Sequence, residues 1–461
     1  MLSIASGLIF ACAAAGEVAA AEARPEYKSI RYDEDWSALR DPALRTDPLD
    51  AIKWIPLTGD GSWYMTLGGE FRERFESSRN RGFGLPTRGQ DDYFLHRIYL
   101  FSDVHYGPHV RSFVEVATGA VSGWDGIVPA TQEDDLDLLQ GFGEITLPLT
   151  LGTVMLRAGR QEMSFGSSRL VSVRESPNIR RSFDAIRVSW NPSQDFKADA
   201  FVARPVIPQT GTFDDGNDPD QLFGGVYSTF SVSAVPGLKA DLYYFGLERD
   251  VAAFAQRRGR EERHTVGTRL FGTSGAFDYN LEAAYQFGSF GSSDISAWTA
   301  SADIGYTLDA LPFSPRLGLK ADAISGDGDL KDGRLGTFNP LFPKLPYFSE
   351  ANLAAPANLL DIQPGISISP RKDVKFEFSW NPLWKQSRED AFYGPSLTAV
   401  KGTAGGNSRF IGQQFIASGD WSVTERLSVS GTYVHFEPGA RLKDVDASSG
   451  DYLALSTRWR F

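Results

Sequence analysis

The chain has 461 residues, a formal net charge of −12, 46 glycines and an aromatic content of 13%. The acidic balance argues against nucleic acid as a partner, because proteins that bind it present basic surfaces. The one cysteine is Cys12, and no apolar run reaches the roughly 18 residues that a transmembrane helix needs.

The first residues resemble a secretory signal peptide. A short apolar run at 2–16 is followed by small residues, with expected cleavage near Ala21 or Ala23, although the usual basic start is missing. A lipoprotein signal at Cys12 is the weaker alternative, because Phe10 is bulky.

We divide the chain into three parts. Residues 1–23 are interpreted as a signal peptide and 24–62 as an irregular periplasmic extension rich in Asp and Pro. Residues 63–461 are interpreted as one β-barrel, because strand-like runs dominate from Trp63 onward.

The predicted strands show alternating apolar and polar residues. In the last one, Leu453, Leu455 and Trp459 share one face, and Ser456, Arg458 and Arg460 the other, as in a strand with one apolar side. The predicted strands are Trp63–Arg74, Asp92–His105, His109–Ala117, Gln140–Leu147, Gly152–Arg160, Phe183–Trp190, Lys197–Ile207, Leu222–Ser231, Leu238–Leu247, Arg263–Phe271, Phe277–Phe287, Ile295–Leu308, Pro315–Ile324, Ala357–Ile368, Lys375–Trp380, Arg409–Asp420, Arg426–Phe436 and Asp451–Phe461.

The connections between these strands alternate between short turns and long links. The long links are 75–91, 118–139, 161–182, 208–221, 248–262, 325–356, 381–408 and 437–450. An even-stranded transmembrane barrel shows this pattern, with short periplasmic turns and long extracellular loops. A soluble sandwich rarely exceeds ten strands without splitting, so the pattern favours an all-β, antiparallel, up-and-down barrel.

Several stretches resemble the alginate export family of outer-membrane barrels. They are LGGEFRERFE (Leu67–Glu76), GRQEMSFGSSRL (Gly159–Leu170) with RRSFDAIRV (Arg180–Val188), SGDGDLKDGRLGTFNPLFP (Ser325–Pro343) with NLLDIQPG (Asn358–Gly365), and LWKQSREDAFYGP (Leu383–Pro395) with RFIGQQ. The resemblance implies eighteen strands, a Gram-negative outer-membrane location, and export of an anionic uronate polysaccharide. On such a barrel the terminal Phe461 is the expected signal for the membrane-insertion machinery.

Placing the apolar face of each strand outward predicts a basic lumen, with fourteen basic residues against seven acids. The predicted inward bases are Arg72, Arg74, Arg97, Arg111, Arg157, Arg187, Lys197, Arg263, Arg269, Arg316, Lys320, Lys375, Arg458 and Arg460. The predicted inward acids are Glu70, Asp103, Glu115, Asp199, Glu282, Asp322 and Glu377. A narrow passage concentrates such charge and attracts anions, and arginine can bind a carboxylate through two hydrogen bonds. The alternative is that these bases and acids pair to stabilise the wall.

The link 160–181 is basic, whereas the other long links are acidic. We expect it to fold into the lumen as a constriction, with Glu162 and Asp184 as local ion-pair partners. The alternative is a solvated loop that binds lipopolysaccharide phosphates. The basic residues of this link are Arg160, Arg169, Arg174, Arg180 and Arg181.

No catalytic constellation or cofactor motif is evident, so no enzymatic activity and no cofactor are predicted. Asp327, Asp329 and Asp332 could hold Ca²⁺, but they lack the downstream bidentate Glu of an EF-hand, and a turn is the better interpretation.

The favoured function is an anion-selective channel that exports an acidic polysaccharide. The alternative is a porin that takes up small anions such as uronate oligosaccharides or aromatic acids. The expected partners are outer-membrane lipid, lipopolysaccharide and periplasmic secretion or assembly proteins.

Overall fold

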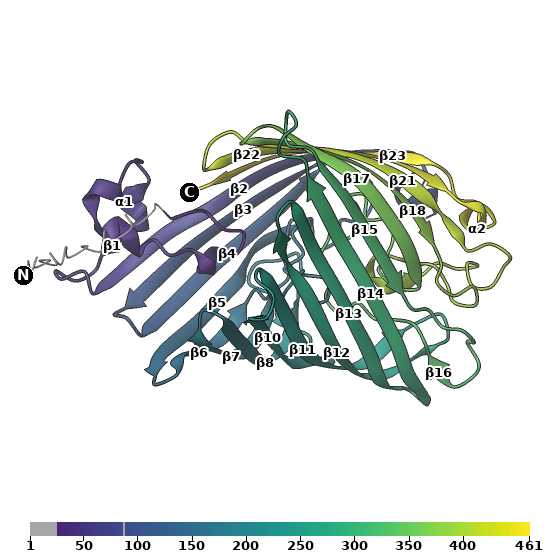
Figure 1. Cartoon of the computed structure of the whole chain (residues 1–461), viewed down its shortest axis with the longest axis horizontal. Coiled ribbons are helices and arrows are strands. Elements are labelled where there is room, and N and C mark those ends of the chain that lie inside the picture. Colours follow the sequence, from purple (N-terminus) through teal and green to yellow (C-terminus); the bar gives the residue numbers. More distant parts are fainter. Residues whose placement is uncertain (1–24, 86–87) are drawn as a thin grey trace, which may run out of the picture.

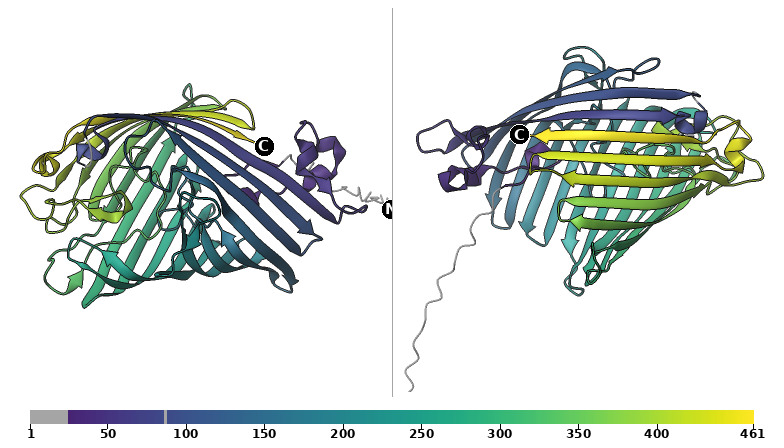
Figure 2. Two further views of the ribbon diagram at one scale, coloured as in Figure 1. Left: turned by 180° about the vertical axis from the view of Figure 1, so that it is seen from behind. Right: turned by 90° about the horizontal axis from the view of Figure 1, so that it is seen from above.

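The computed structural model describes residues 25–85 and 88–461. The predicted signal peptide lies outside these ranges. Eighteen long antiparallel strands form a closed barrel (Figures 1 and 2), which confirms the predicted fold. The strands of the wall are β2 (Trp63–Arg79), β3 (Gln90–Tyr106), β4 (Val110–Ser122), β5 (Asp134–Leu149), β6 (Gly152–Gln161), β7 (Phe183–Ser193), β8 (Phe196–Ile207), β10 (Gln221–Ser231), β11 (Leu238–Ala253), β12 (Arg258–Ser274), β13 (Phe277–Phe290), β14 (Ser293–Thr307), β15 (Arg316–Ile324), β17 (Leu359–Arg371), β18 (Val374–Trp384), β21 (Phe410–Ser422), β22 (Leu427–Pro438) and β23 (Gly450–Arg460).

The barrel closes where the last strand pairs with the first. The register of β23 against β2 runs from Arg460 opposite Glu70 to Asp451 opposite Arg79. One residue further, Phe461 and Gly69 exchange two backbone hydrogen bonds, of 2.8 and 3.0 Å between nitrogen and oxygen. Within the described ranges the wall therefore has no unpaired edge strand. A sheet that faces lipid requires such closure.

The two faces of the wall reverse the pattern of a soluble protein. Apolar side chains point outward, and Leu100 and Leu242 are 48% and 51% exposed. Charged side chains such as Glu70, Arg97 and Arg263 point inward and are buried. No helix in the described ranges is long and apolar enough to cross a membrane. An apolar outside and a polar inside are the features of a transmembrane barrel.

The two ends of the barrel differ in the length of their connections. At one end the chain turns within a few residues, as at 107–109 between β3 and β4. The other end carries the long loops, which contain β9 (Gly216–Asn217), β16 (Arg334–Leu335), β19 (Tyr393–Gly394), β20 (Thr398–Ala399), η4 (Arg81–Gly84), η5 (Pro395–Leu397) and α2 (Ala440–Lys443). The short-turn end is the periplasmic end and the loop end is extracellular, as in other outer-membrane barrels.

Several strands are longer at the extracellular end than predicted. β5 begins at Asp134 rather than Gln140, and the predicted long link 248–262 is reduced to 254–257 because β11 and β12 both continue into it. The added residues are mostly polar, so they do not show the apolar alternation that marks a lipid-facing strand.

The N-terminal extension is not an isolated irregular segment. It forms η1 (Arg31–Asp33), η2 (Ser37–Arg40), η3 (Pro42–Leu44), α1 (Asp50–Lys53) and β1 (Ile55–Pro56), which pairs with β2. The extension lies at the periplasmic end (Figure 1), where Trp36, Leu39 and Trp54 make a small apolar core of their own.

Candidate functional site

Two extracellular loops fold back into the barrel and fill part of its lumen. In the first, 162–182, Phe165 stacks on Phe201 of β8, and Asn178 accepts a hydrogen bond from Tyr99 of β3 through its backbone oxygen. This loop therefore contacts wall strands that are five positions apart in the barrel. In the second, Phe342 donates its backbone N–H to the carbonyl of Leu170, over 2.9 Å. The two loops thus hold each other.

The second inward loop differs from the prediction. Link 325–356 was expected outside as a whole, but Gly336–Pro340 are buried. The reason is an apolar cluster inside the barrel, in which Phe338 and Phe342 pack with residues of the first loop and of the wall. Aromatic residues in an outer loop are the sequence signal for such an inward fold.

The basic residues of the first loop divide into paired and unpaired cations. Arg169 lies 2.8 Å from Asp322 and 3.5 Å from Glu282. Arg180 contacts Glu162 at 3.4 Å and also pairs with Glu175.

Arg174, Arg181 and Lys344 of the two loops make no ion pair with any carboxylate of the described residues. Burial lowers the pKa of Arg174 to about 10 and that of Lys344 to about 8. The pKa of Arg181 is also lowered, by burial and then by the charge of Arg174.

Arg160 and Asp184 do not belong to the lumen, contrary to the prediction. They are opposite each other on β6 and β7, and their side chains are 2.9 Å apart. Arg157 and Arg187 point inward on the same two strands. Arg160 is an odd number of residues from Arg157, and Asp184 from Arg187, so their side chains point outward because successive side chains of a strand alternate between its faces. Their ion pair therefore joins two strands on the outside of the barrel.

A cluster of charges surrounds the barrel seam. The carboxylate of Glu70 on β2 meets Arg97 of β3, and Arg460 and Arg458 of β23 at 3.0 and 3.6 Å. Glu175 of the first inward loop also binds Arg97 and Arg458, each at 2.7 Å. The seam and the inward loop are thereby joined through buried ion pairs.

Arg157 and Arg187 were expected to line the permeation path, and the structure buries both. They are directly opposite each other in the β6–β7 register. Arg157 is 4.0 Å from the ring centre of Tyr32 and pairs with Glu144 at 2.7 Å. Arg187 pairs with Asp199 at 2.8 Å. Both act as parts of the wall.

Most other inward bases are also paired. Arg72 is the exception: it donates to three carbonyls of 175–177 and to the side-chain oxygen of Asn178. The remaining ion pairs join Arg74 with Glu76 and Glu350, Arg111 with Asp103, Lys197 with Asp199, Arg263 with Glu261, Arg269 with Asp241, Arg316 with Asp278 and Asp303, and Lys320 and Lys375 with Glu377.

The prediction that inward bases outnumber inward acids twofold on the strands is therefore wrong. The inner face also carries acids that were not among the predicted inward residues. These are Glu76, Glu144, Asp241, Glu261, Asp278 and Asp303. Wall arginines are largely neutralised, and uncompensated positive charge remains on the inward loops.

A cavity of about 290 Å³ lies between the inward loops and the wall near the seam. Its basic residues are Arg72, Arg74 and Arg458, and its acids are Glu175, Glu350 and Asp420. The wall strands contribute the hydroxyls of Ser428, Ser430 and Ser456. The serines and the two loop acids were not predicted, because short polar residues carry no distinctive sequence signal.

The extension narrows the barrel from the periplasmic end. Tyr32 packs edge-on against Phe142, with ring centres 5.4 Å apart, and its hydroxyl donates to the carbonyl oxygen of Glu162 over 2.8 Å. Arg180 donates to the backbone oxygen of Ser29 over 2.8 Å. The extension, which enters from the periplasmic end, thus contacts the first inward loop, which enters from the extracellular end.

The weak Ca²⁺ candidate forms a series of turns. The side chains of Asp327, Asp329 and Asp332 each accept a backbone N–H two residues ahead. Burial raises the pKa of Asp327 to about 6. Among the described residues these three carboxylates do not form a group with metal-ligand spacing, whereas Asp134, Asp137 and Asp215 do.

The family and fold comparisons agree with this architecture. The alginate export family model matches residues 63–456. The solved structure of OpdO from Pseudomonas aeruginosa is 13% identical, with a TM-score of 0.57 over 86% of this chain and 97% of that one. OccAB4 from Acinetobacter baumannii is 10% identical, with a TM-score of 0.57 over 86% and 98% of the two chains.

OpdK from Pseudomonas aeruginosa, solved with vanillate, is also 10% identical, with a TM-score of 0.57 over the same shares. At these identities the likeness concerns the fold alone. No curated protein matches the chain in sequence.

Proposed function

This chain belongs to the alginate export family of outer-membrane β-barrels, and from that membership we propose that it is a passive channel for export of an acidic polysaccharide. Its location is the outer membrane of a Gram-negative cell. The family and the similar structures are transport channels rather than enzymes.

The unpaired cations of the inward loops support the proposal that the permeating substrate is an anion. Arg174, Arg181 and Lys344 lie inside the barrel without a carboxylate partner among the described residues, while the arginines of the wall are mostly paired. Fixed positive charge in a narrow, partly dry passage lowers the free energy of a permeating carboxylate.

The cavity at the seam supports the carbohydrate part. Its serine hydroxyls can donate hydrogen bonds to sugar hydroxyls and accept them. The guanidinium group of Arg458 can donate hydrogen bonds to a uronate carboxylate. In this proposal, outer-membrane lipid and lipopolysaccharide surround the barrel. Periplasmic secretion or assembly proteins would bind at its short-turn end.

Uptake of small anions is the second candidate, and the narrow lumen favours it. The two inward loops leave a cavity of about 290 Å³ against the wall beside the seam. That volume suits a small carboxylate, and OpdK is a similar barrel solved with one, vanillate. A long polymer would require these elements to move.

The anionic selectivity is tested by the reversal potential across a planar bilayer under a salt gradient. We expect an anion preference in the wild type, a shift towards cations in Arg174→Gln with Lys344→Gln, and a shift towards anions in Asp420→Asn. Lys372→Gln, in a periplasmic turn, is the matched control. The shifts should shrink at 1 M salt, where the Debye length is about 3 Å.

A wild-type preference for cations would refute the anionic substrate, and unmoved reversal potentials in both variants would refute the assigned path. Export is separated from uptake by surface polysaccharide, which should fall in a deletion strain and return with the restored gene. Unchanged surface polysaccharide would favour uptake.

A further inference from the structure

A gap in the wall opens where the first inward loop leaves it. Strand β6 ends at Gln161, and its pairing with β5 stops at Gly141. Strand β5 continues to Asp134, so its extracellular end has lost its β6 neighbour. The lost partner has to be replaced, because an exposed row of backbone donors and acceptors is unfavourable.

The loop 208–220 takes the place of β6 at this edge. Phe213 donates its backbone N–H to the carbonyl of Leu136 over 2.9 Å, and Leu136 forms a parallel bridge with Thr212. The loop starts at the end of β8, so it reaches across the ends of β7 and β6 to meet β5. This contact closes the wall above the inward loop.

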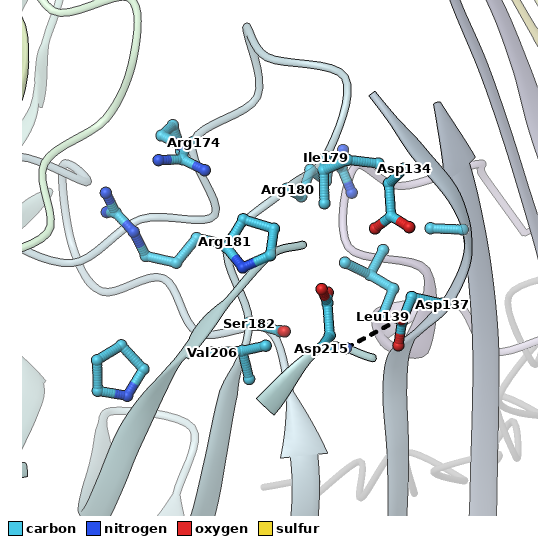
Figure 3. A pocket seen from close by; sticks show the side chains of 13 residues that line it. Asp134, Asp137, Leu139, Arg174, Ile179, Arg180, Arg181, Ser182, Val206 and Asp215 are labelled. Carbon is cyan, nitrogen blue, oxygen red and sulfur yellow. Dashed lines mark hydrogen bonds between the residues drawn. The ribbon is translucent and has the colours of Figure 1, made fainter. Parts of the chain in front are cut away.

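Three carboxylates meet at the same junction. Asp134 and Asp137 come from β5 and Asp215 from the loop, and one oxygen of each lies within 4.8 Å of the others. Asp137 accepts the backbone N–H groups of Asp214 and Asp215 over 2.8 and 3.1 Å. Figure 3 shows the carboxylates of Asp134 and Asp215 facing the space between them.

Asp134 is the decisive residue of this group. It is 1% exposed, and neither of its carboxylate oxygens has a hydrogen-bond partner among the residues that the structure describes. Other buried carboxylates of the barrel, such as Glu70 and Glu261, are bound by arginines. A buried carboxylate without a partner is strongly unfavourable, so Asp134 requires a ligand or a proton.

Among the described residues, no cation forms an ion pair with these three acids. Asp135 and Asp214 add negative charge nearby. Three arginines line the same cavity. Arg180 is bound by Glu162 and Glu175, and Arg174 and Arg181 form no ion pair with the three acids in the part of the chain that the structure describes. The guanidinium of Arg160 is bound by Asp184 and reaches Asp215 only at its backbone oxygen. The cavity itself has a volume of about 70 Å³, enough for an ion with a water molecule.

We propose that Asp134, Asp137 and Asp215 bind a Ca²⁺ ion that fastens loop 208–220 to β5. Ligands that are all oxygen select a hard cation, and Ca²⁺ accepts irregular sets of carboxylates, carbonyls and waters. Mg²⁺ demands near-ideal octahedral geometry, and Zn²⁺ prefers nitrogen and sulfur ligands. The site faces the outside of the cell, where Ca²⁺ sites typically bind in the range of about 0.1–1 mM.

The ion would also hold the first inward loop. Ile179, Arg181 and Ser182 of that loop line the same cavity as the three acids. A bound ion therefore closes one compact junction between the wall, the outer loop and the base of the constriction.

Equilibrium dialysis tests the proposal by measuring how many Ca²⁺ ions bind per chain. The full-length protein is refolded into detergent micelles free of lipopolysaccharide and treated with EDTA before the measurement. We expect the wild type to bind one more Ca²⁺ per chain than Asp134→Asn with Asp215→Asn. Asp220→Asn, an exposed change in the same loop, should bind as the wild type does. Equal stoichiometry in wild type and double variant would overturn the proposal.

A second measurement reports the fastening itself. Chymotrypsin cleavage after Phe213 should slow at least tenfold in the wild type when 5 mM Ca²⁺ replaces EDTA, and Mg²⁺ at the same concentration should give much less protection. The correctly inserted double variant should be cleaved at a rate that Ca²⁺ does not change. Calcium-independent cleavage of the wild type would also refute the site.

Discussion

Replacing Tyr32 by alanine should loosen the extension and widen the periplasmic mouth. Tyr32 is 5% exposed, it lies under the guanidinium of Arg157, and its ring contacts Phe113 and Phe142. Truncating a buried aromatic side chain costs about 3–5 kcal/mol. Since every 1.4 kcal/mol is a factor of ten, docking of residues around Tyr32 should weaken by about 100- to 4,000-fold.

Tyr32→Phe is the matched control, because it removes only the hydroxyl that donates to Glu162. One hydrogen bond contributes about 1 kcal/mol, so this variant should weaken docking by only about fivefold. Both variants keep the anchors that Arg31 and the Trp36 cluster provide, so the barrel itself should still insert.

Docking is measured by trypsin cleavage after Arg31, which is 2% exposed in the docked extension. Single-channel conductance in a planar bilayer reports the width of the mouth. We expect the cleavage rate and the conductance to rise in Tyr32→Ala and to change little in Tyr32→Phe. If cleavage and conductance of Tyr32→Ala stay within twofold of the wild type, the extension neither depends on Tyr32 nor narrows the channel.

Three other perturbations test the seam and the loop junction. Glu70→Gln leaves three arginines around a neutral amide, so it should lower the free energy of unfolding in urea by about 3–5 kcal/mol. The control Glu389→Gln, at an exposed position, should change this free energy by less than about 0.5 kcal/mol. Equal unfolding free energies of the two variants would contradict the role of the seam cluster. Burial raises the pKa of Asp215 to about 6, so in EDTA the charged loop docks less well than the protonated one. Cleavage after Phe213, normalised to the single variant Asp215→Asn, should therefore increase from pH 4 to pH 7. A flat profile would show that Asp215 titrates normally. Deleting Phe461 should reduce heat-modifiable, assembled barrel on gels at unchanged synthesis, and normal assembly would remove its role as a terminal signal.

The strands could be predicted from the sequence because each crosses lipid and must alternate. Leu453, Leu455 and Trp459 are outward and Arg458 and Arg460 inward, as their spacing indicated. The alternation fails above the membrane, and so the extracellular ends of β5, β11 and β12 were missed.

The inner surface was harder to predict because charge pairing depends on neighbours far apart in sequence. Glu175 binds Arg458 across 283 positions, and Tyr32 reaches Glu162 across 130. Periodicity places a residue on a face, but it does not reveal which loop covers that face. For that reason Arg157 and Arg187 were assigned to an open path although Tyr32 and Phe165 cover them.

The contact of Arg31 with the seam sets an order of events during assembly. Arg31 donates to the carbonyl oxygen of Gly69 over 2.7 Å and to that of Phe461 over 3.1 Å. These two acceptors come from the first and last strands, and they stand side by side only after the barrel has closed. The extension can therefore take its final position only as a late step, so a half-built barrel keeps a wide mouth and the finished one is narrowed.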